Sequence, residues 1–307
     1  MPTSDLAVAA SGLVKRFGAR RVVDGVDIAV PAGSIYGVLG PNGAGKTTTL
    51  RMLLGIIEPD AGHRTLLGHD APREASDRVG YLPEERGLYP AMRAREGIAF
   101  MGALRGLPWA EGRRRAGPLL ERAGLGHAAD TKIRKLSKGM AQIVQLLGSI
   151  VHEPDVLVLD EPFSGLDPVN QERLEALILA ERARGATVLF STHIMAHAER
   201  LCDRLAIIAG GRRRFEGTVD DARGTLPMQV SYRPRRAEAP LAALLPSGAR
   251  EAAGTWRFPL PDDGIEPLLA RLTGDGAPGI AGLSIERPGL HDAFVRIVGE
   301  PAPETAS

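Results

Sequence analysis

Three features that would narrow the class of this protein are scarce or absent in its 307 residues. Cys202 is the single cysteine, so no intramolecular disulfide can form and a reducing compartment is compatible with the sequence. No stretch approaches the ~18 consecutive apolar residues of a membrane-spanning helix. The first residues also lack the basic start and apolar run of a signal peptide. We therefore expect any role at a membrane to depend on a partner protein.

Net charge is also nearly absent, because 38 basic residues are balanced by 37 acidic ones. This balance gives no polyelectrolyte character, so we expect no nucleic acid as a partner. We interpret the arginine clusters at 113–115, 212–214 and 233–236 as solvated faces, with contact to anionic lipid headgroups as the alternative. The length and the hydrophobic fraction of 44% fit one large globular domain with a smaller one.

The stretch from Gly40 to Thr48 has the spacing of a phosphate-binding P-loop, Gly, four residues, then Gly-Lys-Thr. The apolar run at 35–39 predicts a buried strand before it, and the residues after it predict an amphipathic helix. These flanking elements disfavour a glycine-rich turn that matches by chance. Backbone N–H groups of such a loop wrap a triphosphate, and side chains at its glycines would block that approach. The predicted nucleotide-binding residues here are Asn42, Gly43, Ala44, Gly45, Lys46, Thr47 and Thr48.

Two residues of this loop have distinct expected roles. Lys46 can reach the β- and γ-phosphate oxygens, and Thr47 can offer its hydroxyl to Mg²⁺. The helix that follows directs its positive N-terminus at the phosphates. The loop therefore predicts a site for a nucleoside triphosphate and a magnesium ion.

Two residues outside the loop are ambiguous from the sequence. The alternating segment before the loop predicts an antiparallel edge sheet, and Phe17 within it can either stack on a purine or belong to the core. A second strand is predicted to end at Leu82, which places Glu84 in a loop at the carboxyl end of a strand. Glu84 is then either a ligand-binding residue or a solvated charge.

A helical insertion without strands is predicted from about 92 to 150. Its last helix opens at Ser137, which either caps the helix or holds its hydroxyl for an anion.

The apolar run at 156–159 predicts a strand buried in a parallel sheet, and it ends in Asp160-Glu161. Two adjacent carboxylates at a strand end are costly unless they have partners. Asp160 can bind the Mg²⁺ that Thr47 also binds, and Glu161 can accept a proton from an attacking water. His193, at the end of a further predicted strand, can hydrogen-bond a γ-phosphate oxygen.

This set of motifs in this order resembles the ATP-binding subunit of ABC transporters over residues 5 to 224. Gly40 to Thr47 matches the Walker A motif, 156–161 the Walker B motif, 164–167 the D-loop and Leu136 to Met140 the signature. The resemblance implies a P-loop NTPase fold of the α/β class, a RecA-like mixed sheet core with an antiparallel edge sheet and a helical insertion. The cofactors implied are ATP and Mg²⁺.

The resemblance also implies residue roles. Catalysis would rest on Glu161 as the base, His193 as the switch histidine and Lys46. Phe17 would stack on adenine, while Ser137 and Gly139 would touch a γ-phosphate. The metal ligands implied are Thr47, Asp160 and the residue of the Q-loop, which appears here as Glu84 in place of glutamine.

The sequence departs from the family pattern at two places. Lys138 replaces the first glycine of the signature and Met140 its glutamine. Glu84 can still ligate a metal ion, but its extra negative charge is expected to slow hydrolysis or to change metal affinity.

The resemblance implies a homodimer with two ATP molecules at its interface and a separate integral membrane permease as partners. The subunit would lie peripherally at the cytoplasmic face of the cell membrane, and its C-terminal end resembles the drug- or sodium-export branch. The alternative is a non-transport ABC ATPase that acts as an ATP-dependent switch on a soluble partner. Such proteins generally carry two cassettes or a long inserted coiled coil, which this sequence lacks.

We expect an ATPase domain at 1–224, with its helical subdomain at roughly 88–150, and a small accessory α/β domain at 225–307. In the second domain we predict strands at 228–232 and 255–260 and helices at 265–272 and 291–298. Trp256 and Phe258 are expected in its core. It contains no cluster of residues with catalytic spacing.

Overall fold

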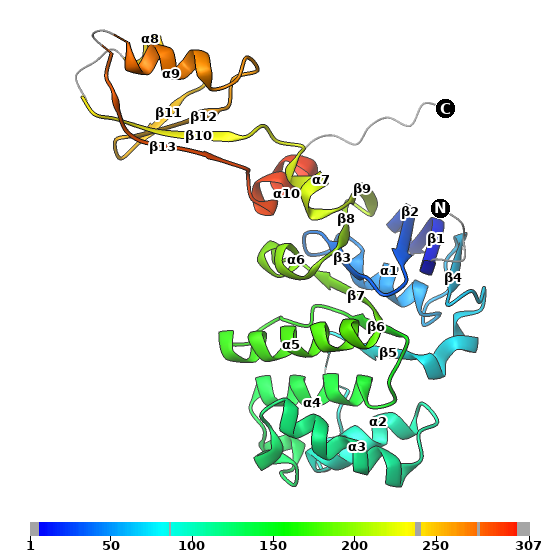
Figure 1. Cartoon of the computed structure of the whole chain (residues 1–307). Coiled ribbons are helices and arrows are strands. Elements are labelled where there is room, and N and C mark those ends of the chain that lie inside the picture. The colour runs from blue at the N-terminus through cyan, green and yellow to red at the C-terminus, as the bar shows by residue number, and fades with distance from the viewer. Residues whose placement is uncertain (1–5, 86, 237–240, 275–276, 300–307) are drawn as a thin grey trace. The chain divides into compact units, whose positions relative to one another are not determined.

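The structure, a computed structural model, describes residues 6–85, 87–236, 241–274 and 277–299. The described chain forms two compact units, one up to Val219 and the other over Asp220–Gly299 (Figure 1). The predicted domain boundary at residue 224 lies close to this division and stays a prediction. No helix in the described ranges is long and apolar enough to cross a membrane.

The first unit is built on a six-stranded sheet in the order β5-β6-β7-β3-β8-β9. The first five strands are parallel and β9 joins antiparallel to β8. All residues of β3, β6 and β7 are buried, as expected of parallel strands covered on both faces. The strands are β3 Ile35–Leu39, β5 Val79–Leu82, β6 Val156–Leu159, β7 Thr187–Thr192, β8 Arg204–Ala209 and β9 Arg212–Gly217.

Successive residues of these strands enter two different cores. In β6, Leu157 packs with the helical side and Val158 with the other side, because neighbouring side chains of a strand point to opposite faces. One face is covered by α1 (Lys46–Leu53) and by an antiparallel sheet in the order β2-β1-β4. The strands of that sheet are β1 Leu6–Phe17, β2 Arg20–Pro31 and β4 Ala61–Leu66. The predicted α/β fold with its antiparallel edge sheet is confirmed.

The other face is covered by helices, including those of the insertion. The described insertion contains helices without a strand of any sheet, as predicted. Helix α4 is buried along nearly its whole length. The helices of this unit outside α1 are α2 Ala94–Ala103, α3 Trp109–Arg122, α4 Lys138–Ile150, α5 Pro168–Arg184 and α6 Met195–Leu201, with short 3-10 helices at Pro72–Arg78, Gly126–Ala128 and Ile133–Lys135.

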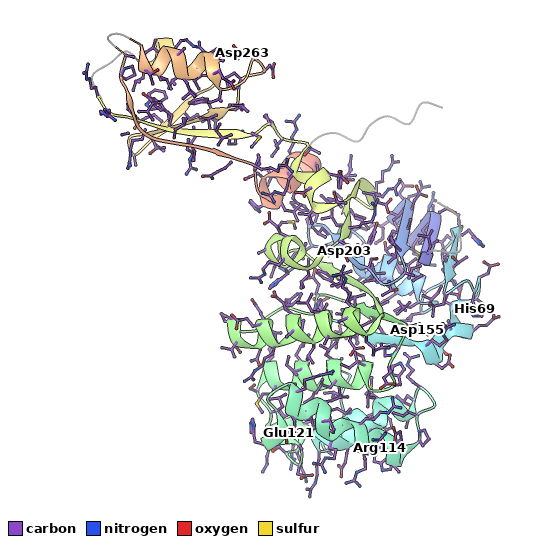
Figure 2. All side chains as sticks on the ribbon, viewed as in Figure 1. His69, Arg114, Glu121, Asp155, Asp203 and Asp263 are labelled. Carbon is purple, nitrogen blue, oxygen red and sulfur yellow. The ribbon has the colours of Figure 1, made fainter. Side chains whose placement is uncertain are left out.

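Charged residues tie the ends of the sheet strands to neighbouring elements. Asp203, labelled in Figure 2, accepts a hydrogen bond from the backbone N–H of Ile35 at 2.9 Å and one from Arg182 at 2.7 Å. Asp155, just before β6, accepts one from Arg78 at 2.6 Å. These contacts position the strands at the end of the sheet opposite to the P-loop.

The second unit holds a four-stranded antiparallel sheet in the order β11-β12-β10-β13. Phe258 is buried in its core, and Trp256 packs against that core, as predicted. Helices α8 and α9 lie on one face of this sheet (Figure 1). The strands are β10 Gln229–Pro234, β11 Arg250–Ala252, β12 Thr255–Pro259 and β13 Ile280–Glu286, and the helices are α7 Val219–Arg223, α8 Leu241–Leu244, α9 Glu266–Thr273 and α10 Leu290–Gly299.

Candidate functional site

The P-loop backbone runs from the end of β3 to the start of α1 and is shaped by its glycines. Gly43 and Gly45 have φ values of 77° and 102°, in the left-handed region that favours glycine. A Cβ atom at Gly45 would lie 2.7 Å from the carbonyl oxygen of Val22, and one at Gly40 would lie 2.2 Å from that of Ile208. From the sequence, we expected Gly45 because a side chain there would block the approach of a phosphate. The structure adds that the neighbouring backbone of β2 already occupies the space of a side chain.

A cavity of about 590 Å³ lies over this loop. It brings the predicted loop residues together with three predicted residues from distant parts of the chain, Glu84, Glu161 and His193. Its described lining is Arg20, Val22, Asn42, Gly43, Ala44, Gly45, Lys46, Thr47, Thr48, Glu84, Glu161, Ser164 and His193. Arg20 and Ser164 were not predicted as site residues from the sequence.

Lys46 and Glu161, which both line this cavity, form a buried ion pair. Lys46 Nζ lies 3.0 Å from Glu161 Oε1, and both side chains are less than a tenth exposed. Lys46 also donates hydrogen bonds to the carbonyl oxygens of Gly40 at 2.8 Å and Pro41 at 3.3 Å. A buried charge needs such partners, because its removal from water is otherwise too costly.

Asp160 is fully buried and holds one oxygen without a hydrogen-bond partner. Its Oδ1 accepts hydrogen bonds from Thr47 Oγ1 at 3.0 Å and from Ser191 Oγ at 2.7 Å, while Oδ2 is unsatisfied. A hydroxyl beside a free carboxylate oxygen is a donor set that suits Mg²⁺, which prefers oxygen ligands and binds through few protein groups. The residues present therefore fit the ion that the sequence predicted.

Glu161 is held in an uncommon backbone conformation by contacts on three sides. Its φ of 47° lies in the left-handed region, which costs a residue other than glycine about 1–3 kcal/mol. Its backbone N–H donates to Ser191 Oγ at 2.9 Å. Its side chain lies between Lys46 and His193, whose Nδ1 is 2.9 Å from Glu161 Oε2. The carboxylate is thus placed at the cavity edge between two nitrogen groups.

Ser191 is a further residue of this site that the sequence analysis missed, besides Arg20, Val22 and Ser164 of the cavity lining. It is fully buried at the end of β7 and its hydroxyl contacts both Asp160 and the backbone of Glu161. The one signal available from the sequence was a hydroxyl residue near the carboxyl end of a strand predicted to be buried in the parallel sheet.

Phe17 does not belong to the core, since 51% of the residue is exposed. It ends β1 and pairs with Arg20 across the hairpin to β2, which places it next to a residue of the cavity wall. Lys15 Nζ lies 5.9 Å from the centre of its ring. The alternative of a core residue is wrong, and an exposed ring is free to stack on a base.

Ser137 caps α4, because its hydroxyl accepts a hydrogen bond from the backbone N–H of Met140 at 3.2 Å. Gly139 is needed for packing, since a Cβ atom there would lie 2.4 Å from Nδ2 of Asn170 on α5. Neither residue is among the described residues that line the cavity. The exposed Ser137 is therefore not brought to the P-loop of its own chain.

Of the three residues that depart from the family pattern, Lys138 and Glu84 are exposed, and Met140 is partly buried against the helical core. A Cβ atom at Gly165 would lie 2.4 Å from Lys138 Nζ, so Lys138 occupies the space that a side chain would need at this position. Glu84 lines the cavity, and the loop that carries it is tied to α4 by a hydrogen bond of 3.3 Å from Gln145 to the carbonyl oxygen of Glu85.

Comparison with known proteins gives a consistent result. The ABC transporter family matches residues 23–164. The chain is 42% identical over 299 residues to the Nod factor export ATP-binding protein I of Burkholderia orbicola, covering 93% of this chain and 94% of the relative. It is 34% identical over 315 residues to the daunorubicin/doxorubicin resistance ATP-binding protein DrrA of Streptomyces peucetius, covering 98% and 95%.

A solved structure described as the ATP binding subunit of an ABC transporter superposes on this chain with a TM-score of 0.66. Its sequence is 34% identical, and the match covers 71% of this chain and 92% of that one. These findings support a transporter ATPase over the alternative of a switch that acts on a soluble partner. With its P-loop cavity and these full-length relatives, the chain belongs to the ATP-binding subunits of ABC transporters and is an ATPase.

Proposed function

We propose that this subunit hydrolyses ATP in the cavity over the P-loop with Glu161 as the base, and that two copies drive a separate integral membrane permease for the export of a drug, an ion or another small solute. The observation that carries the proposal is the placement of Glu161 between Lys46 and His193 at the cavity edge. The remaining residue roles follow from contacts around this carboxylate.

Lys46 changes partner in the proposed cycle. Its ammonium pairs with Glu161 and with backbone carbonyl oxygens in the structure. A bound triphosphate offers Lys46 phosphate oxygens, which releases Glu161 Oε1 to accept a proton from water. His193 then holds the other carboxylate oxygen and, being partly exposed, reaches a γ-phosphate oxygen from the same edge.

The magnesium ion would be held by Thr47 and Asp160, with Glu84 as a further oxygen ligand at the cavity wall. A bound Mg²⁺ neutralises phosphate charge in phosphoryl transfer. The chain's own contribution is to hold Asp160 Oδ2 unpaired and buried, so that it is available to a cation.

The proposal of a homodimer rests on Ser137. Its hydroxyl is exposed at the N-terminus of α4, where helix N–H groups favour anions, yet it does not line the cavity of its own chain. A second copy would bring Ser137 and Gly139 to the γ-phosphate held by the first. Phe17, exposed beside Arg20, would stack on the adenine ring.

The proposals of a permease, of export and of a location at the cytoplasmic face of the membrane rest on the family. The chain belongs to transporter subunits, and no helix in its described ranges can span a membrane. Two relatives carry names that refer to Nod factor export and to daunorubicin/doxorubicin resistance. These names support export of a small solute as the direction and type of transport.

We expect Glu161→Gln to keep ATP binding and to lose about 10²–10⁴-fold in turnover, because the amide cannot accept the proton. ATP binding is measured by equilibrium titration, turnover by phosphate release, and dimer trapping by size-exclusion chromatography with ATP. The matched control is Glu172→Gln, which changes an exposed carboxylate of α5 and should leave all three readouts unchanged. Hydrolysis at the parent rate in Glu161→Gln would contradict its assignment as the base.

We expect Glu84→Gln to raise the hydrolysis rate and the Mg²⁺ concentration needed for half-maximal rate, each by about 2–10-fold, because one negative charge leaves the metal environment. Phosphate release measured across a magnesium titration checks both values. Glu85→Gln, one residue along the same loop, is the control for a general loss of charge. An unchanged rate together with an unchanged Mg²⁺ dependence would remove Glu84 from the site.

We expect Ser191→Ala to lower turnover by about 10-fold or more, because both Asp160 and the backbone of Glu161 lose a hydrogen-bond partner. The control is Ser149→Ala, which removes another buried hydroxyl, one bonded within α4. Thermal unfolding and phosphate release are measured for both variants. Equal turnover in the two variants would show that Ser191 contributes only to stability.

We expect a polytopic membrane protein to co-purify in stoichiometric amount when Glu161→Gln is extracted from its native cells in mild detergent with ATP. Mass spectrometry of the complex identifies the partner, and extraction of the same variant without ATP is the control. Recovery of soluble partners alone would move the assignment to an ATP-dependent switch.

A further inference from the structure

One face of the sheet in the second unit is polar and carries paired arginines. The strand register aligns Arg250 of β11 with Arg257 of β12, Arg257 with Ser231 of β10, and Ser231 with Ser284 of β13. Directly opposed residues of antiparallel strands point to the same face. These four side chains therefore form one row across the whole sheet, which we call the arginine row.

The arginine row lies on the face away from α8 and α9. Val230, Tyr232 and Phe258, which alternate with the row along their strands, are buried in the core that includes the helix residues Leu268 and Leu272. Arg250 and Arg257 are exposed, and Ser231 and Ser284 are partly exposed. Figure 1 shows α8 and α9 together on one side of this sheet.

Two like charges opposite each other are unfavourable in a sheet. The Cβ atoms of such a pair lie about 4.5–5.5 Å apart, so Arg250 and Arg257 destabilise each other. Among the described residues, neither guanidinium forms a hydrogen bond or an ion pair with a carboxylate. The pair keeps ten N–H donors toward solvent, in the fork geometry that binds carboxylates bidentately.

Arg233 extends the charged surface along the sheet. A Cβ atom at Gly282, the residue opposite Arg233 on β13, would lie 3.7 Å from both Nε and Nη2 of Arg233. The guanidinium of Arg233 therefore covers this glycine on the face of the arginine row. Arg233 is two residues along β10 from Ser231, which makes it a diagonal neighbour of Arg257 at about 7–8 Å. This spacing matches the repeat of about 6.6 Å between alternate residues of an extended chain.

We propose that this face binds an acidic, extended segment of a partner protein, with carboxylates at alternate positions paired to Arg233 and to the Arg250–Arg257 pair. The Ser231 hydroxyl can donate a hydrogen bond to the segment, and the Ser284 hydroxyl, which donates to Glu286, can accept one from a backbone N–H of the segment. Glu286, which hydrogen-bonds Ser284 at 3.0 Å, limits the basic surface on the side away from Arg233.

Other occupants fit this face less well. Single-stranded nucleic acid is bound by stacking on aromatic rings, and the aromatic residues of the sheet, Tyr232, Trp256 and Phe258, all lie on the core face. A second copy docked through the same surface would place arginines against arginines. Acidic residues such as Asp263, in the loop that leads into α9, lie outside the arginine row (Figure 2).

The test uses the full chain and a fluorescein-labelled peptide of alternating glutamate and serine, with fluorescence anisotropy at low ionic strength. We expect saturable binding with Kd below about 1 mM, because bidentate hydrogen bonds between guanidinium and carboxylate groups are stronger than single surface ion pairs. Arg250→Gln/Arg257→Gln should weaken it at least ~10-fold. The matched control, Arg113→Gln/Arg271→Gln, removes two exposed arginines from other surfaces and should bind within about twofold of the parent.

Absence of saturable binding to the parent chain, or equal binding by the Arg250/Arg257 variant and the control, would overturn the proposal. Vesicles containing phosphatidylglycerol and a single-stranded oligonucleotide serve as competing probes. If either one binds through these arginines while the peptide does not, the proposed partner is wrong. Thermal unfolding of the variant should show no loss of stability, because the substitution removes a like-charge contact, and ATP hydrolysis should be unchanged.

Discussion

The buried carboxylates at the end of β6 are the constraint on which the nucleotide site depends. Asp160 and Glu161 lie at the carboxyl edge of a parallel sheet, where an unpartnered charge is costly. Two elements supply their partners, namely α1 through Lys46 and Thr47, and β7 through Ser191. The site therefore depends on the pairing of β6 with β7 and on the position of α1 after β3.

The two carboxylates have different kinds of partner. Asp160 accepts hydrogen bonds from hydroxyl groups of two buried elements, and its other oxygen has no hydrogen-bond partner. Glu161 pairs instead with the ammonium of Lys46, and this ion pair avoids the cost of an unpaired buried charge.

The second unit uses the same alternation of strand residues for a different purpose. Its inward residues build a small core under α8 and α9. Its outward residues include exposed arginines. The residues of the arginine row are not among the described residues that line the nucleotide cavity, and we propose the row as a binding surface for a partner protein. Attachment of such a surface to an ATPase unit would allow binding partners to differ without change at the nucleotide site.

The P-loop, the Asp160-Glu161 pair, the helical insertion and the family could be predicted from the sequence, because local spacing and hydrophobic periodicity encode these features. The fold was needed to show that Phe17 is exposed, that Ser137 lies away from its own P-loop, and that Ser191 connects the carboxylate of Asp160 to the backbone N–H of Glu161. It also decided that Arg250 and Arg257 stand side by side. Contacts between distant strands depend on strand order and register. A shift of the register by one residue would turn the side chains of a strand to the opposite face of the sheet.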